Sequence, residues 1–390
     1  MNIRDNTDAA FLADVEQWLD ASLARMRTRF APHEWVHAEC RTAWNAELCA
    51  ANLVALDWPR ELGGRNLSTA ALIKFHEMCA VRRAPQPLNS IAHSILAPTL
   101  LKFGTEEQKR RFLEGIRLGT EVWCQGYSEP GSGSDLASVK TRASHENDGW
   151  VVNGHKVWTT QAHAARWCFA LVRTDPDSRA HKGLSFMLVD LKAAGARVEP
   201  IRQITGEADY NEVFLEQVHV PDGNLVGAPG DGWRIAMAAA EYERGIYFLP
   251  RVIQLEAELQ DVEALFERAA PAEPARTRLA AALATLSDTC FVIRCRVDAI
   301  LRRVATGSTP GTDGAVLKLL WSETRQALQE IRMELLGEAA MLGPDSGARF
   351  SEAAVATREF LWSRAETIVA GTSEIQRNII AERVLGLPKG

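Results

Sequence analysis

The chain has 390 residues, of which 46% are hydrophobic and 24% are charged, and its formal net charge is −6. This composition excludes a disordered chain and predicts two or three packed units, because a single core rarely extends over so many residues. The acidic balance and the lack of a long basic tract argue against nucleic acid as the main partner.

Further classes of protein are excluded by short patterns. No apolar run is long enough to cross a membrane, and the N-terminal residues lack the apolar core of a signal peptide, so we expect a cytoplasmic protein. The seven cysteines contain no C-x-x-C pair, and no histidine cluster has the spacing of metal ligands. We therefore expect reduced, mostly buried thiols and no metal site.

The elements are expected in the order helices, strands, helices. Residues 1–120 carry apolar side chains at three- and four-residue spacing, which is typical of helices. Residues 121–228 contain short β-prone runs separated by Gly, Pro and Asp, which predict a small antiparallel barrel or sandwich. Within them, Asn153-Gly154 is typical of a type I′ turn and predicts a hairpin. The helical period returns over residues 229–390 and predicts a bundle.

A loop rich in glycine and serine follows the first expected strand, in "WCQGYSEPGSGSDLAS" (residues 123–138). Gly131 and Gly133 add no side chains, so backbone N–H groups and hydroxyls there can approach a flat polar ring or a phosphate. Taken alone, such a loop is more often an ordinary surface turn. It is not a P-loop and does not open a dinucleotide-binding βαβ unit, because the residues and strand pattern that those motifs need are missing.

A second motif, "VAGTSEIQR" (residues 369–377), predicts the start of a helix. Ser373 and Gln376 have the spacing of a capping box, and Gly371 precedes them. Free N–H groups at a helix start can hold an anion or a cofactor. The side chain at Ala370 is inert, so the reactive group of any site here must lie elsewhere.

Together, these motifs resemble the acyl-CoA dehydrogenase family, over nearly the whole chain. The motifs occur in the family's order and are "WPRELGG", "FGTEEQKRRFLEGI", "YSEPGSGSD", "NGHKVWTT" and "GTSEIQRNIIAERVLGLP". The resemblance implies an α+β fold with an N-terminal helical domain (1–120), a middle antiparallel β-barrel (121–228) and a C-terminal helix bundle (229–390). It also implies α,β-desaturation of an acyl thioester on CoA or a carrier protein. FAD would accept a hydride at N5, and an electron-transfer flavoprotein would reoxidise it.

The resemblance also assigns individual residues to the cofactor and the substrate. Those assigned to the cofactor are Gln125, Tyr127, Ser128, Ser134, Trp158, Thr160, Gly337, Thr372 and Glu374. The first three would lie along the isoalloxazine ring, Trp158 would pack beside it, and Thr160 would contact its polar edge. Ser134 would also meet the pantetheine arm of the substrate. On its own, an aromatic residue such as Trp158 is more often part of a core.

Desaturation requires a carboxylate that removes the α-proton. In much of the family this Glu precedes Gly-Thr-Ser of the last motif, where this chain has Ala370. A minority of the family places it on the first helix of the bundle, just before an Arg, which here indicates Glu243 before Arg244. The ordinary alternative for these two residues is a solvated ion pair. The competing carboxylate is Glu241, which would lie on nearly the opposite face of a helix.

Two further expectations concern groups near the reacting thioester. Arg244 and Glu241 are assigned, with Ser134, to substrate binding. The backbone N–H of Ala370 can still donate to the thioester oxygen, because a main-chain donor survives replacement of the side chain.

Two motifs of the family are altered in this chain. The Arg-x-Phe-Gly stretch of the bundle is replaced by "APAEPARTRLAAAL", and the adenine-side motif appears as "ELLGEAA" (residues 334–340). Both changes resemble a bacterial subgroup that includes steroid-side-chain desaturases, some of which work as two-subunit complexes. We therefore expect a homo-oligomer (dimer or tetramer) or a pair with a homologous subunit.

The changed motifs leave alternative functions open. One is a subunit whose flavin site is incomplete without its partner. Others are an acyl-thioester oxidase, which uses oxygen, and a nucleic-acid-binding relative of the same fold, against which the acidic charge argues.

Overall fold

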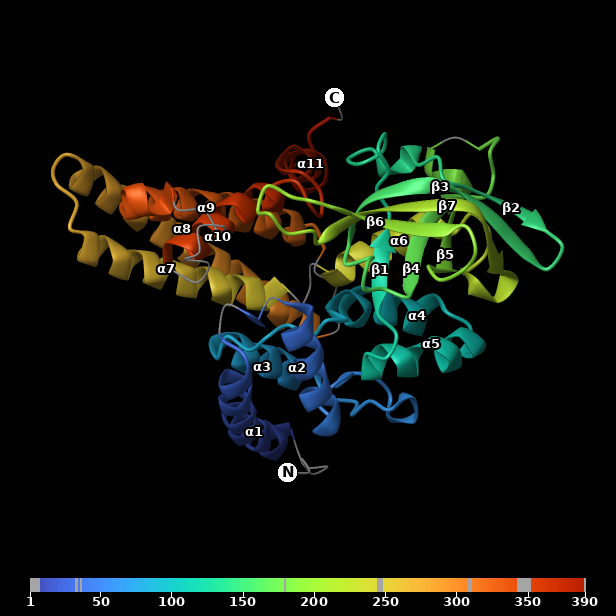
Figure 1. Cartoon of the computed structure of the whole chain (residues 1–390), viewed down its shortest axis with the longest axis horizontal. Coiled ribbons are helices and arrows are strands. Elements are labelled where there is room, and N and C mark those ends of the chain that lie inside the picture. Colours follow the sequence, from blue (N-terminus) through green and yellow to red (C-terminus); the bar gives the residue numbers. More distant parts are fainter. Residues whose placement is uncertain are drawn as a thin grey trace. The chain divides into compact units, whose positions relative to one another are not determined.

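The computed structural model describes residues 8–31, 34–35, 37–178, 180–243, 248–306, 311–341 and 352–388, and only the backbone of residues 241 and 243 (Figure 1). The chain divides into two compact units, one comprising Met1–Leu67 with Pro85–Glu243 and the other comprising Ser68–Ala84 with Arg244–Gly390. We call them the sheet unit and the helical unit. The three-domain division expected at residues 120 and 228 stays a prediction.

The helices of the sheet unit lie mostly before its strands in the sequence. They are α1 (Asp8–Arg29), α2 (Ala38–Ala50), η2 (Arg60–Leu62), η3 (Ala92–Leu96), α4 (Ala97–Phe103), α5 (Glu106–Leu118), η4 (Leu136–Ser138), η5 (Ala180–Gly183), η6 (Asp222–Asn224) and α6 (Gly232–Glu243). The start of α5 is fixed by a capping box, in which the Thr105 hydroxyl accepts from the Gln108 N–H at 3.2 Å and the Gln108 side chain accepts from the Thr105 N–H at 3.0 Å. It ends at Gly119, whose left-handed φ of 69° suits glycine.

The strands form one sheet in the order β6-β7-β3-β2-β4-β5-β8, and β1 pairs with β4. They are β1 (Trp123–Gly126), β2 (Arg142–Glu146), β3 (Gly149–Thr160), β4 (Trp167–Arg173), β5 (Leu184–Asp190), β6 (Ala196–Ile201), β7 (Tyr210–Pro221) and β8 (Leu225–Val226). The expected antiparallel arrangement needs a correction, because β1 and β2 both pair with β4 in parallel. A parallel pair requires a connection that returns the chain, and the β2–β3 hairpin lies within the connection between β1 and β4.

The hairpin turn expected at Asn153-Gly154 is wrong. β3 runs through these two residues, and the chain reverses before it, at residues 147–148, where Asn147 has a left-handed φ of 55°. The register of β3 against β7 shifts at this point, so the Asn-Gly pair marks a β-bulge. A Cβ at Gly154 would lie 2.2 Å from Thr141 Oγ1, so close packing, not a turn, requires the glycine.

Aromatic side chains join α5 to the beginning of β1. The rings of Trp123 and Trp167 are stacked with centroids 5.4 Å apart, on directly paired positions of β1 and β4. Phe112 of α5 meets both rings edge-on at 5.3 and 5.2 Å. Such pairs add stability beyond their buried area, so this cluster anchors the strand that leads into the Gly/Ser loop.

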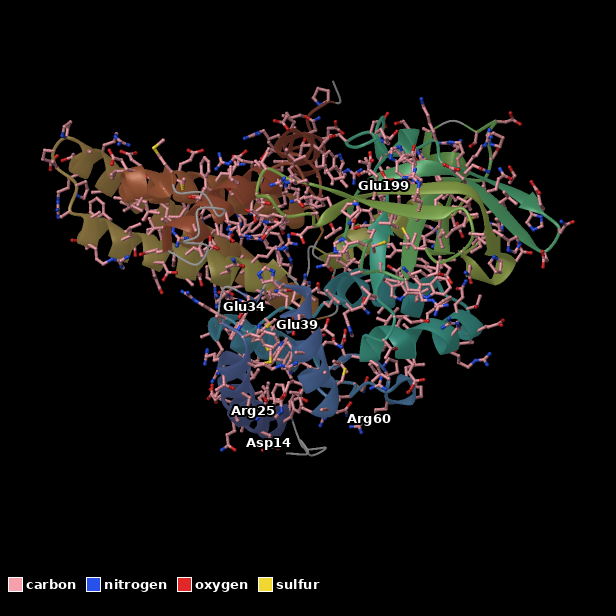
Figure 2. The ribbon with its side chains drawn as sticks, viewed as in Figure 1. Asp14, Arg25, Glu34, Glu39, Arg60 and Glu199 are labelled. Atoms are coloured by element: carbon pink, nitrogen blue, oxygen red, sulfur yellow. The ribbon has the colours of Figure 1, made fainter. Side chains whose placement is uncertain are left out.

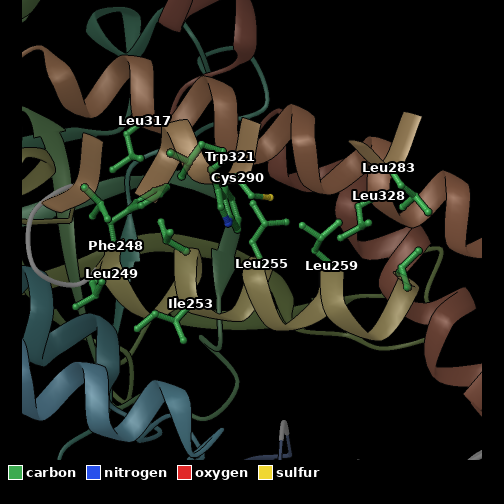
Figure 3. Packing of buried hydrophobic residues seen from close by; sticks show 14 of the residues in the cluster. Phe248, Leu249, Ile253, Leu255, Leu259, Leu283, Cys290, Leu317, Trp321 and Leu328 are labelled. Carbon is green, nitrogen blue, oxygen red and sulfur yellow. The ribbon is translucent and has the colours of Figure 1, made fainter. Parts of the chain in front are cut away.

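The helical unit contains α3 (Thr69–Val81), α7 (Leu249–Ala269), α8 (Ala275–Ala305), α9 (Asp313–Leu336), η8 (Gly337–Met341), α10 (Glu352–Glu366), α11 (Ser373–Ile379) and η9 (Ile380–Val384). Its core is formed by apolar side chains at helical spacing on α7, α8 and α9 (Figure 3). Phe248 meets the Trp321 ring edge-on at 5.5 Å, and the Trp321 indole N–H donates to the Arg251 carbonyl at 3.1 Å. α3 packs against α7 and α8 although it lies far from them in the sequence.

Two chain-wide expectations can be checked on the described residues. In these ranges, no helix is both long and apolar enough to span a bilayer. The seven cysteines all lie within them as free thiols, and Cys295 of α8 is the exposed one. Burial raises the pKa of Cys79 to about 12 and, with the nearby Glu256 and Glu263, the pKa of Cys290 to about 11.

Candidate functional site

In the sheet unit, the segment that follows β1 runs beside β3. Gln125 is the third residue of β1, and the half-buried Tyr127 and Ser128 come directly after the strand. The Ser128 carbonyl accepts from the N–H of Val157 at 2.9 Å. The structure therefore brings the predicted flavin residues of this segment next to the part of β3 that leads to Trp158.

The Gly/Ser loop then continues to an exposed tip. Glu129 and Ser132 exchange two backbone hydrogen bonds of 3.0 Å, which close the start of the loop. Ser134 is exposed beyond them. A Cβ built at Gly131 or Gly133 would meet no atom of the described residues within 4 Å. A ligand can therefore approach the backbone at both glycines without obstruction from neighbouring side chains.

Trp158 occupies a strained position on β3. The register against β7 shifts between Lys156 and Thr159, and at this bulge Trp158 has a left-handed φ of 60°. A non-glycine residue pays about 1 kcal/mol or more for such a backbone. The indole is 57% exposed and meets the Tyr210 ring edge-on at 6.2 Å. Strained backbone of this kind clusters at functional sites, and here it presents an exposed aromatic side chain. The half-buried Thr160, two residues on, also pairs with Tyr210.

A buried ion pair joins the two segments, and the sequence reasoning did not single it out. Lys156 is fully buried, and its Nζ donates to Glu129 Oε1 at 2.8 Å, to the Leu171 carbonyl at 2.7 Å and to the Tyr127 carbonyl at 3.2 Å. An ammonium group has three N–H donors, so all three are used. Lys156 and Glu129 lie inside the quoted motifs "NGHKVWTT" and "YSEPGSGSD". No alternating pattern marks Lys156, because Lys156 and the next residue, Val157, are both buried where the register against β7 shifts.

The carboxylate of this pair is equally well held. Glu129 also accepts from the backbone N–H groups of Lys140 at 2.6 Å and Thr141 at 2.8 Å. Burial alone would raise the pKa of Glu129, but Lys156 and these hydrogen bonds lower it below its usual range. Burial lowers the pKa of Lys156, and Glu129 opposes that change. The hydrogen-bond geometry fits the ionised pair, since a neutral amine would have one donor too few.

In the helical unit, the cap at the last motif differs from the expected one. Thr372, not Ser373, is the N-cap of α11, and its hydroxyl accepts from the Ile375 N–H at 3.2 Å. Gln376 is therefore not the partner in a capping box. Its side chain instead donates to the carbonyls of Ala370 at 3.0 Å and Gly371 at 3.2 Å. The two neighbouring hydroxyls cannot be ranked from sequence, because the backbone angles decide which one caps.

Ala370 lies at the sharp bend before this cap. It has a left-handed φ of 56°, and Gly371 follows with a φ of 92°. The bond from Gln376 to the Ala370 carbonyl fixes the orientation of this part of the main chain. The structure thus holds the Ala370 backbone in a defined, strained conformation of the kind that clusters at functional sites.

The remaining predicted residues belong to both units. Glu374 is exposed in the first turn of α11, where its own N–H and the Thr372 hydroxyl lower its pKa. Gly337 is the C-cap of α9, with a φ of 54°, and begins η8. Arg244 and the side chains of Glu241 and Glu243 lie outside the described residues, although α6 includes the backbone of both glutamates.

A second buried charge cluster lies in the helical unit. The Arg325 side chain of α9 is 3% exposed and contacts Glu258 of α7 through two N–H groups, at 2.8 and 2.9 Å. It also donates to Glu359 at 2.5 Å and to Glu366, both on α10. Burial raises the pKa of Glu366 to about 7; Arg325 opposes this rise, and the other two carboxylates add to it. Such networks also occur in cores that carry no chemistry, so we interpret the cluster as part of the bundle.

One open hollow of about 520 Å³ lies on the helices of the sheet unit. It is lined by Arg29, Glu39, Thr42, Ala43, Ala46, Glu47 and Ala50. Figure 2 shows the charged side chains of this surface, including Arg25 of α1, which pairs with Glu47 at 2.6 Å, and Glu39 of α2. None of the predicted site residues whose side chains the structure describes lines this hollow, so it does not carry a functional assignment.

Comparison with known proteins identifies the family. Three family models match consecutive parts of the chain, described as the acyl-CoA dehydrogenase N-terminal domain (residues 6–120), middle domain (124–218) and C-terminal domain (230–385). The chain is also 46% identical, over 386 residues, to acyl-CoA dehydrogenase IpdE1 of Mycobacterium tuberculosis, with 97% of each chain covered. The chain belongs to the acyl-CoA dehydrogenase family. The expected family, α+β fold class and enzyme class are thereby confirmed.

Solved structures of other acyl-CoA dehydrogenases agree with this fold. The Tcur3481-Tcur3483 steroid ACAD matches with a TM-score of 0.85 and 26% identity, covering 100% of both chains. The ChsE4-ChsE5 complex of Mycobacterium tuberculosis matches with a TM-score of 0.81 and 27% identity, again over 100% of both chains. Both are assemblies of two different named chains.

Proposed function

We propose that this acyl-CoA dehydrogenase binds FAD and removes the α- and β-hydrogens of an acyl thioester. The observation that carries the proposal is the strained, exposed Trp158 beside the segment of Tyr127 and Ser128, because an aromatic wall next to backbone donors suits a flat heteroaromatic ring. The open space at Gly131 and Gly133 supports the close approach of such a ligand. When bound, FAD accepts the β-hydrogen with its electron pair.

The chain's own residues supply the rest of the chemistry. We assign the α-proton to the carboxylate of Glu243, because Ala370 has no group that can accept a proton. The Ala370 N–H is the proposed donor to the thioester oxygen, which makes the α-proton more acidic. The left-handed φ of Ala370 and the bond from Gln376 to the amide that follows this N–H support this role, since a preorganised donor need not reorient during the reaction.

The relatives support a proposal for the substrate class. We propose a CoA ester of a steroid-derived acyl chain, because the matching Tcur3481-Tcur3483 structure is a steroid ACAD. Arg244, Glu241 and Ser134 are the proposed contacts to the substrate. An electron-transfer flavoprotein is the proposed electron acceptor, and oxygen consumption during turnover would instead indicate the oxidase alternative.

The test of the base is anaerobic reduction of the bound flavin by a panel of acyl-CoA esters that includes steroid-derived ones. Glu243→Gln should bind the ester but reduce its flavin about 10²–10⁴-fold more slowly, the usual contribution of a general base. Glu216→Gln, an exposed carboxylate of β7, is the matched control and should keep the wild-type rate. Normal reduction in Glu243→Gln, or loss of reduction in Glu241→Gln instead, would contradict the assignment.

A second candidate is a subunit of a two-chain enzyme. It is favoured by the replacement of the Arg-x-Phe-Gly stretch in this chain and by the two-chain assemblies of its structural relatives. The absorption spectrum of the chain purified alone separates the two candidates. A yellow protein with a flavin spectrum supports a self-sufficient site, and a colourless one that gains flavin only with a homologous chain supports the subunit.

A further inference from the structure

Lys156 and Glu129 link the two segments that the proposed function assigns to the flavin. Lys156 precedes Trp158 by two residues on β3, and Glu129 directly follows Ser128. The Lys156 ammonium group also donates to the carbonyl of Tyr127 at 3.2 Å. That carbonyl belongs to the same amide as the N–H of Ser128. One buried cation therefore contacts both segments.

We propose that Lys156 is a positioning residue for FAD. Its ammonium group holds the amide between Tyr127 and Ser128 against β3 and makes the Ser128 N–H a stronger hydrogen-bond donor to the flavin ring. This inference rests on the proposed function, because it requires that Ser128 faces the ring.

The physical basis is polarisation of one amide. A cation at a carbonyl oxygen draws electron density from the amide, so the N–H of that amide donates more strongly, and hydrogen bonds in series strengthen one another. The first donor of the series is well defined, because Lys156 is fully buried. The Ser128 carbonyl belongs to the next amide, and the N–H of Val157 fixes that amide beside β3. Two-electron reduction adds negative charge to the flavin ring. A stronger donor therefore favours reduced FAD over oxidised FAD.

The pairing with Glu129 keeps this effect local. The ammonium and the carboxylate, 2.8 Å apart, have no net charge together, so their combined field weakens quickly with distance. The atoms that Lys156 contacts directly, including the Tyr127 carbonyl, feel it most. A lysine on the surface would be hydrated and screened, and its effect would be smaller.

The test compares the wild-type chain with Lys156→Met, each loaded with FAD, and uses the two-chain complex if flavin is retained only there. We expect the dissociation constant of FAD to rise at least tenfold in the variant. We also expect the binding of reduced FAD to weaken about tenfold more than that of oxidised FAD, which lowers the two-electron reduction potential by about 30 mV. Released FAD is measured by its fluorescence and the potential by equilibration with reference dyes.

A double variant separates positioning from stability. Lys156→Met leaves the Glu129 carboxylate buried without its cation, which lowers the melting temperature of the apoprotein. Lys156→Met/Glu129→Gln removes that unpaired charge, so its melting temperature should return toward the wild-type value. The reduction potential should stay low, because the Tyr127 carbonyl still lacks its donor. A potential that recovers together with the melting temperature would overturn the proposal.

Arg173→Met is the matched control, because Arg173, at the end of β4, contacts the same loop. Arg173 donates to the carbonyls of Val139 at 3.2 Å and Ala137 at 2.9 Å and so holds the far end of the loop. We expect a lower melting temperature and less than a twofold change in the ratio of the two FAD affinities. If the wild-type chain binds FAD and Lys156→Met has the same reduction potential, the role of Lys156 is overturned but the proposed function is not. A wild-type chain that retains no FAD, alone or in the complex, would overturn the proposed function as well.

Discussion

The two units each bury a cluster of charged side chains, and the clusters differ in their balance. In the sheet unit, Lys156 meets one carboxylate, Glu129. Two backbone carbonyls accept from the other two donors of Lys156, and two backbone N–H groups donate to Glu129. In the helical unit, Arg325 meets three carboxylates on α7 and α10. The balanced pair is ionised, whereas the unbalanced cluster raises the pKa of Glu366 to about 7, because burial penalises its charge and the other carboxylates repel it.

The number of carboxylates around a buried cation decides how the cluster responds to pH. A pair of one cation and one anion fixes two segments of backbone. A cation shared by several carboxylates joins three helices but leaves one group close to its titration point. The second arrangement makes the stability of a helix bundle depend on pH, even when no substrate is present.

The largest expected effect comes from removing the shared cation. Arg325→Met leaves Glu258, Glu359 and Glu366 buried without it, although Arg358 still contacts Glu359 at 2.6 Å. Breaking a buried pair in this way typically costs about 3–5 kcal/mol, so we expect a loss of this size in the free energy of unfolding. Urea denaturation followed by circular dichroism measures it.

An exposed pair in the same unit serves as the control. Arg278 and Glu334 form an ion pair, but their side chains are 59% and 45% exposed. Glu334→Gln should change the free energy of unfolding by less than about 1 kcal/mol, because solvent screens exposed pairs. If Arg325→Met and Glu334→Gln lowered the free energy of unfolding equally, burial would not determine how much an ion pair stabilises this unit.

The next expected effect is a pH dependence that Glu366→Gln abolishes. The folded state raises this pKa from 4.5 to about 7, so it favours the protonated form. The stability contributed by this group is complete below about pH 4.5 and is lost as the pH rises toward 7. Arg325, Glu258, Glu359 and Arg251 are the charged groups that face it.

The measurement for this prediction is the urea midpoint of both proteins between pH 4.5 and 8. As the pH rises over this range, the free energy of unfolding of Glu366→Gln should increase by about 2–3 kcal/mol relative to that of the wild type. Most of this increase should be complete near pH 7. Glu330 forms an ion pair with Arg364, and its side chain is 59% exposed. Glu330→Gln should therefore show no such trend. A constant difference between variant and wild type would mean that Glu366 is ionised throughout.

The smallest expected effect on the free energy of unfolding comes from a substitution near the pair of Lys156 and Glu129. Gly154→Ala would push a Cβ against Thr141, whose N–H donates to Glu129 at 2.8 Å. We expect this overpacking to lower the free energy of unfolding by about 1–2 kcal/mol. Gly131→Ala, in open space, should change it by less than about 0.5 kcal/mol. Similar losses at both glycines would indicate a backbone effect and contradict the steric explanation.

The order of the elements was predictable because it depends on local patterns. The change from helical to strand period near residue 121 and its return near residue 229 are present in the apolar spacing itself. The capping box at Thr105 and Gln108 uses residues three positions apart, so the start of α5 also follows from local sequence.

The errors concern features that distant residues decide. Asn153-Gly154 has the composition of a turn, but pairing with β7 and contact with Thr141 make it a bulge. The parallel pairing of β1 with β4 depends on where the chain returns after the β2–β3 hairpin. Likewise, Lys156 and Glu129 are 27 residues apart, so no periodic pattern connects them.

The candidate site was predictable only as far as the family's motifs extend. These motifs placed Tyr127, Ser128 and Trp158 in a common neighbourhood, and the structure brings their segments together in the sheet unit. The motifs did not predict the left-handed φ of Trp158, because backbone strain at one residue depends on the surrounding sheet.

The exposed thiol of Cys295 allows the helical unit to be labelled selectively. The thiolate is the reactive form of cysteine, and burial keeps a thiol such as Cys290 protonated and inaccessible at neutral pH. A maleimide dye should therefore attach to α8 in the unaltered protein. The dye would report the unfolding of the helical unit, which contains the Arg325 cluster, separately from that of the sheet unit.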